Sequence, residues 1–95
     1  MRRGFAGTIE EHSNSLPYVL RALERHLDDA ERHFQAGRCK MGFPYAAEAF
    51  QKFGEAQVHS KGMTYAEERT YSNRMIRVAQ RVNKLHEATI RCLGR

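Results

Sequence analysis

The sequence predicts an all-α protein, a three-helix antiparallel bundle with a long C-terminal helix, coiled-coil-like seams and a dimeric assembly. Apolar residues recur at steps of three and four along two long segments, as one side of a helix requires. Glycine and proline residues separate three helical segments, and the chain has no alternating apolar runs and no Asn-Gly or Asp-Gly turns that would indicate strands. Helices are therefore expected at about 16–36, 45–61 and 65–93.

Length and composition set the class of protein. The 95 residues imply a single helical domain at 8–95, preceded by a flexible basic arm at 1–7. Apolar residues make up 41% and charged residues 28%, which is typical of a folded protein. No apolar run approaches the about 18 residues of a membrane span, and no signal peptide is visible. Cys39 and Cys92 form no Cys-x-x-Cys pair and are expected as free thiols, which predicts a cytoplasmic protein.

The first helix is predicted to begin at about 16, because Ser15 followed by Pro17 is a favourable start. Thr8 and Glu11 have the spacing of a capping box, which predicts a short turn at about 8–13 before it. Gly37 is expected to end the helix as a left-handed cap. The apolar residues step by 4, 3, 4, 3 and 4, which is an unbroken heptad seam: Leu16, Leu20, Leu23, Leu27, Ala30 and Phe34.

The second helix is expected to follow a connector at 37–44, which contains two glycines and a proline. Pro44 can open this helix, and Gly62 is expected to end it. Thr64 and Glu67 again have capping-box spacing and predict the start of the long third helix. The apolar side of the second helix is formed by Ala46, Ala49, Phe50, Phe53 and Ala56.

The long helix carries an apolar stripe of Tyr71, Met75, Val78, Val82, Leu85, Thr89 and Cys92. With about 29 residues this helix is about 43 Å long, which is more than the second helix can cover, so it either pairs with the first helix or protrudes. A bare apolar seam is seldom left exposed on a monomer, so we predict a homodimer with an interface of Met75, Val78, Val82 and Leu85. Cys92 is predicted to be a small core residue, although an up-down-up bundle would bring it to the same end as Cys39.

A second stripe of the long helix is cationic: Arg74, Arg77, Arg81, Lys84 and Arg91. Residues 69–95 hold seven bases and one acid, and the whole chain has a formal charge of +5. Arginine suits phosphate because its planar guanidinium donates a fork of hydrogen bonds. We predict a small nucleic-acid-associated accessory or regulatory factor, without enzymatic activity or cofactor, that binds through these five residues.

Two other interpretations of the cationic stripe stay open. Residues 8–36 hold six acids and three arginines, so the stripe could pack beside an acidic first helix or pair with an acidic protein surface. A protein–protein adaptor or inhibitor that uses the apolar seam is the alternative function.

The segment Arg81-Val82-Asn83-Lys84-Leu85-His86 has an Arg-x4-His spacing. It resembles the motif of the HEPN-type ribonucleases, helical proteins in which a dimer brings two such motifs together. The resemblance covers these six residues. It implies that Arg81, Asn83 and His86 are catalytic, with His86 as general acid or base.

A metal site is weighed on the first helix, where His26, Asp29 and His33 share a face. Imidazole and carboxylate groups suit zinc, iron or copper. The seven-residue step between the histidines is wide for one ion, and the chain has no His-Glu-x-x-His or Glu-x-x-His pair. We therefore predict no metal.

Overall fold

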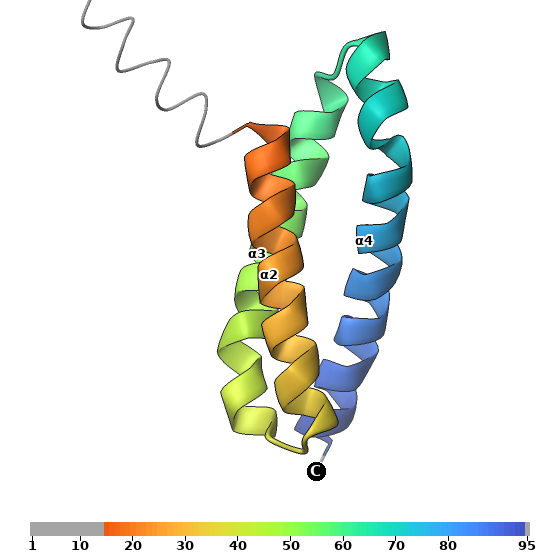
Figure 1. The fold of residues 1–95 in the computed structure, drawn as a ribbon. Coiled ribbons are helices and arrows are strands. Elements are labelled where there is room, and N and C mark those ends of the chain that lie inside the picture. Colours follow the sequence, from red (N-terminus) through yellow and green to blue (C-terminus); the bar gives the residue numbers. More distant parts are fainter. Residues whose placement is uncertain (1–14, 95) are drawn as a thin grey trace, which may run out of the picture.

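The structure is a computed structural model that describes residues 15–94 as three helices, α2 (Leu16–Gln35), α3 (Cys39–Lys61) and α4 (Tyr65–Leu93). Figure 1 shows an up-down-up arrangement, in which α2 and α4 run in the same direction and α3 runs in the opposite direction. No strand occurs in this part of the chain. The predicted all-α three-helix antiparallel bundle is therefore confirmed. The basic arm predicted at 1–7 and the turn predicted at 8–13 lie outside the described residues.

The heptad seam of α2 fills the centre of the bundle. Leu20, Leu23, Leu27 and Ala30 have no exposed surface, and Leu16 and Val19 are buried beside them. Alanines on α3 allow its backbone to lie close to α2, and these two helices pack more closely with each other than either does with α4. The other buried side chains of this core are Ala46, Ala49 and Ala56 from α3, and Val78, Val82 and Leu85 from α4.

Gly37 ends α2 with a φ of +79°, in the left-handed region expected for a glycine cap. The Gly37 N–H donates to the Phe34 carbonyl at 3.0 Å, and the Arg38 N–H donates to the His33 carbonyl at 2.8 Å. These two bonds form the Schellman motif, which satisfies carbonyls that the helix end leaves free. The turn to α3 is therefore very short.

The second helix begins at Cys39, six residues before the predicted position at 45, so the connector expected at 37–44 is mostly helical. Pro44 lies inside α3, where its missing N–H costs one helical hydrogen bond near the helix start. Gly42 serves a packing contact, because an added Cβ would lie only 2.5 Å from Cε1 of Phe34 on α2. Glycine and proline suggested a loop in the sequence, but here they occupy the first turns of a helix.

The long helix begins at the predicted capping box. The Thr64 Oγ1 accepts a hydrogen bond from the Glu67 N–H at 3.2 Å, and the Glu67 carboxylate accepts one from the Thr64 N–H at 2.9 Å. Both bonds satisfy backbone donors that a helix start leaves free. The bounds of α4, Tyr65–Leu93, coincide with the expected 65–93.

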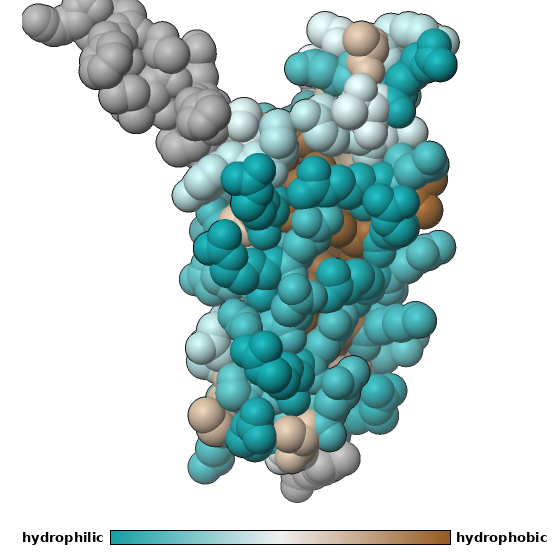
Figure 2. Space-filling view, in the orientation of Figure 1, coloured by the Kyte–Doolittle hydropathy of each residue, from teal (hydrophilic) through white to brown (hydrophobic). Residues whose placement is uncertain are grey.

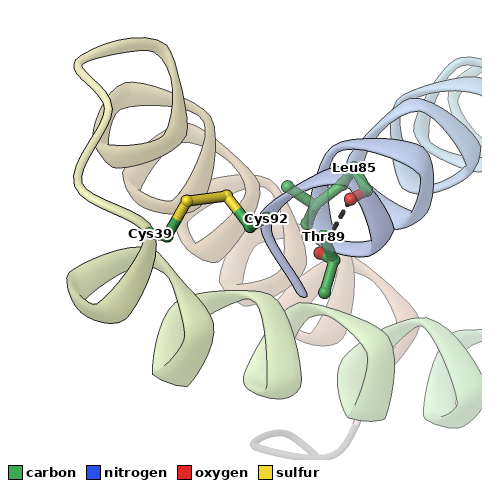
Figure 3. Close-up of a disulfide and its surroundings, with 4 residues drawn as sticks. All are labelled: Cys39, Leu85, Thr89 and Cys92. Carbon is green, nitrogen blue, oxygen red and sulfur yellow. Dashed lines mark hydrogen bonds between the residues drawn. A yellow bond between two sulfur atoms is a disulfide. The ribbon is translucent and has the colours of Figure 1, made fainter. Parts of the chain in front are cut away.

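Cys39 and Cys92 form a disulfide, with their Cα atoms 5.8 Å apart (Figure 3). The expectation of free thiols is therefore wrong. The first residue of α3 and the last turn of α4 lie at the same end of the bundle, and their Cα separation is in the ordinary range for a disulfide. Disulfides are rare in reducing compartments, so the cysteines no longer support a cytoplasmic protein. None of the three helices between residues 15 and 94 is long and apolar enough to span a membrane.

Candidate functional site

The five bases predicted to bind nucleic acid divide into two groups on α4. Arg74 and Arg81 are partly buried and reach α2, whereas Arg77, Lys84 and Arg91 are exposed to solvent. Arg74 donates from Nε to Glu24 Oε2 at 2.9 Å and from Nη2 to Glu24 Oε1 at 2.8 Å. This two-pronged geometry is the strongest form of an arginine–carboxylate pair.

Arg81 repeats the arrangement one heptad later. It donates from Nε to Glu31 Oε2 at 3.2 Å and from Nη2 to Glu31 Oε1 at 2.9 Å. Its Nη2 also donates to Asp28 Oδ1 at 2.6 Å. Both arginine–glutamate pairs join residues that are 50 positions apart. The two separations are equal because α2 and α4 run parallel and because the glutamates and the arginines are each seven residues apart. We call these two pairs, Arg74–Glu24 and Arg81–Glu31, the α2–α4 ladder.

The ladder also sets the ionisation of its members. The hydrogen bond from Arg74 lowers the pKa of Glu24, despite partial burial of the carboxylate. In turn, the hydrogen bonds to Glu24 and Glu31 raise the pKa of Arg74 and of Arg81. Carboxylates occupy the Nε and Nη2 donors of both guanidinium groups, so these two arginines hold α4 onto α2.

The other three bases form a straight row along α4, which we call the free row: Arg77, Lys84 and Arg91. Their seven-residue spacing corresponds to about 10 Å per step on one side of a helix. All three side chains are exposed, and none has an ion-pair partner among residues 15–94. The free row is therefore the part of the predicted cationic stripe that remains open to a polyanion.

A shallow groove lies beside the free row, where α2 and α4 meet near the disulfide end. Its volume is about 220 Å³, below the roughly 300–1,000 Å³ of typical small-molecule pockets. Figure 2 shows apolar atoms between the polar side chains of α2 and α4 on this face of the molecule. Lys84 and Arg91 border the groove, which is also lined by Glu31, Phe34, Gln35, Leu85 and Ala88.

The side chains predicted to form a dimer interface lie inside the single chain. Val78, Val82 and Leu85 are 2%, 7% and 2% exposed, and Met75 is partly buried against the same core. Both α2 and α3 pack against α4 and cover this seam, so the long helix pairs with the first helix and does not protrude. A partner that used these four residues would have to open the bundle.

The residues of the Arg-x4-His motif do not converge within the chain. Arg81 reaches the acids of α2, whereas the His86 ring meets Phe50 of α3 edge-on, with 5.9 Å between ring centroids. Asn83 is exposed on α4. Within one chain, the arrangement gives His86 and Arg81 no common site for a reacting group.

Of the residues weighed as a metal site, His33 and Asp29 make other contacts, whereas the buried Nδ1 of His26 has no hydrogen-bond partner among the described residues. His33 Nδ1 accepts a hydrogen bond from Arg38 Nε at 3.0 Å, and its ring stacks on Tyr45 with centroids 5.4 Å apart. Asp29 pairs with Arg32. Between residues 15 and 94 no three histidine, cysteine, aspartate or glutamate side chains are arranged to hold a metal ion.

Comparison of the chain with protein families, with curated proteins and with solved structures found no match. The function is therefore inferred from the surface of α4.

Proposed function

We propose that this protein is a small nucleic-acid-binding accessory factor that contacts the phosphate backbone through Arg77, Lys84 and Arg91. The observation that carries the proposal is the division of the α4 bases. Arg74 and Arg81 form ion pairs with α2, whereas the three bases of the free row are exposed in one line. A row that extends over about 21 Å of helix can meet several phosphates of one nucleic-acid strand or duplex. Such contacts carry no sequence information, so the proposed binding is not sequence-specific.

The charge balance supports this proposal. Residues 15–94 hold 13 bases and nine acids, and ion pairs engage four of the bases and five of the acids. Nine bases and four acids remain without an ion pair in this part of the chain, so the unpaired charged side chains are mostly positive. A surface of this kind attracts polyanions and loses affinity steeply as salt is added.

The direct test is fluorescence anisotropy of a labelled DNA duplex at about 50 mM and about 200 mM salt. The proposal expects binding at the lower salt that largely disappears at the higher. Arg77→Gln/Lys84→Gln should weaken this binding, whereas Lys40→Gln/Lys61→Gln, which removes the same charge from exposed positions of α3, should leave it nearly unchanged. Absence of binding to DNA and to RNA at the lower salt would end the proposal.

The groove beside the free row favours one alternative, an adaptor that binds an acidic protein segment. Lys84 and Arg91 would pair with its carboxylates while the apolar floor of the groove accepts a small apolar side chain. Ala88→Leu fills this floor without removing a charge. The adaptor is favoured if the wild-type protein binds no nucleic acid but binds a protein partner stoichiometrically, and if Ala88→Leu loses that partner.

A further inference from the structure

A second heptad series follows α4 outside the core seam: Ile76, Ala79, Asn83, His86, Ile90 and Leu93. The large apolar members of the series are exposed, since Ile76, Ile90 and Leu93 show 56%, 53% and 70% of their surface. Asn83 is exposed as well. Figure 2 shows apolar atoms at the outer edge of α4, surrounded by polar ones. His86 of this series packs on Phe50 of α3, but neither the core nor the proposed nucleic-acid contact accounts for Ile76 and Ile90.

The series has the composition of a helix-pairing seam. Ile76, Asn83 and Ile90 occupy successive positions of the same type in the heptad, so two large exposed apolar side chains lie on one side of the helix, one heptad before and one heptad after a polar side chain. We propose that a second copy of this chain packs on this face of α4. The two copies form a two-fold dimer with Asn83 at the axis.

Self-complementarity points to a second copy as the occupant. A two-fold interface brings the same surface of both subunits together, so the surface must match itself. Ile76 lies seven residues before Asn83 and Ile90 lies seven residues after it. When the two α4 helices run antiparallel, Ile76 of each copy therefore meets Ile90 of the other.

Polar residues select the antiparallel direction. Gln80 and Glu87 lie on the same flank of the series, and an antiparallel pair sets each glutamine amide beside the glutamate of the other copy. In a parallel pair, Arg69, one heptad before Ile76, would face its own copy with like charge. The antiparallel pair places each Arg69 beyond the end of the other α4.

This interface leaves the bundle and the free row intact. Each base of the free row directly follows a residue of the seam, as Arg77 follows Ile76, and so lies about 100° further around the helix. The dimer therefore keeps Arg77, Lys84 and Arg91 at the surface of both copies. The dimer does not depend on the proposed nucleic-acid binding, because its interface uses none of the free-row residues.

Light scattering at micromolar concentration should give a mass twice the 11.0 kDa of the chain. Ile76→Glu/Ile90→Glu should give a folded monomer, since both side chains are exposed in the single chain. Tyr18→Glu/Met41→Glu, which alters exposed apolar residues of α2 and α3, should remain dimeric. A monomeric wild-type protein, or an unchanged dimer of Ile76→Glu/Ile90→Glu, would overturn the proposal.

Cross-linking determines the direction of the helices. Under oxidation Asn83→Cys should couple to itself, because this position lies at the two-fold axis. Ile76→Cys should not couple to itself, because an antiparallel pair separates the two positions by about 14 residues, or about 21 Å. Efficient self-coupling of both variants would contradict the antiparallel arrangement.

Discussion

Loss of the Cys39–Cys92 disulfide should lower the free energy of unfolding by about 4 kcal/mol. The two cysteines lie 53 residues apart, so the bond closes a loop that contains α3 and nearly all of α4. In the chain-entropy description, closing a loop of this length removes about 14 cal/mol/K of entropy from the unfolded chain, which amounts to about 4 kcal/mol at 25 °C. Domains of this size have about 5–15 kcal/mol in total, so the loss is a large fraction of stability.

Urea unfolding, followed by the helical circular dichroism signal, measures this loss. Oxidised wild-type protein, reduced wild-type protein and Cys39→Ser/Cys92→Ser are compared under the same conditions. The serine variant should match the reduced wild type and should not respond to reductant. A difference below about 1 kcal/mol between oxidised and reduced wild type would refute the loop-closure reasoning, because that reasoning assigns about 4 kcal/mol to this loop.

The same unfolding experiment measures the remaining predictions. Gly42→Ala should destabilise by about 1–3 kcal/mol, because its Cβ would meet Phe34 at 2.5 Å; Gly54→Ala, with nothing within 4 Å, should stabilise by about 1 kcal/mol. A double-mutant cycle of Arg74→Gln and Glu24→Gln should give a coupling of about 1 kcal/mol, and additive effects would contradict the ladder. The hydrogen bond from Arg74 lowers the pKa of Glu24 from its usual 4.5. The Arg74–Glu24 pair therefore stabilises the fold fully above pH 4.5, and this stabilisation is lost as the pH falls through the lower pKa that Glu24 has in the folded state. Glu24→Gln should remove this part of the acid dependence.

The helices whose ends are defined by local signals could be predicted from the sequence. The Thr64–Glu67 capping box and the apolar steps that follow it place α4 at the bounds that the structure shows. The start of α2 at Leu16 likewise follows from Ser15 and Pro17, which precede a complete heptad seam. In each case, the residues that determine the helix end lie within one turn of it.

The start of α3 could not be predicted in this way, because it depends on contacts from other helices. Gly42 is a glycine because the Phe34 ring of α2 lies against its backbone, and the sequence around Gly42 does not contain that partner. The disulfide has the same origin, since it requires Cys39 to be helical and α4 to end beside it. Both features become visible only when the bundle is assembled.

The division of the cationic stripe into paired and exposed bases could be predicted only in part from the sequence. Packing beside the acidic first helix was one expectation for the whole stripe, but Arg74 pairs with α2 whereas Arg77 is exposed. The two positions are about 60° apart around α4, and that angle decides whether a side chain reaches α2 or solvent. The matching seven-residue spacing of Glu24 and Glu31 with Arg74 and Arg81 was the available signal.

The most direct test of the proposed role of the free row is the salt dependence of DNA binding. The logarithm of the binding constant is plotted against the logarithm of salt concentration for wild type and for Arg77→Gln/Lys84→Gln. Each lost phosphate contact reduces the slope by about 0.9, so the variant should show a slope that is smaller by about 2. An unchanged slope, or a slope that falls equally in Lys40→Gln/Lys61→Gln, would show that the exposed bases of α4 are not the contact surface.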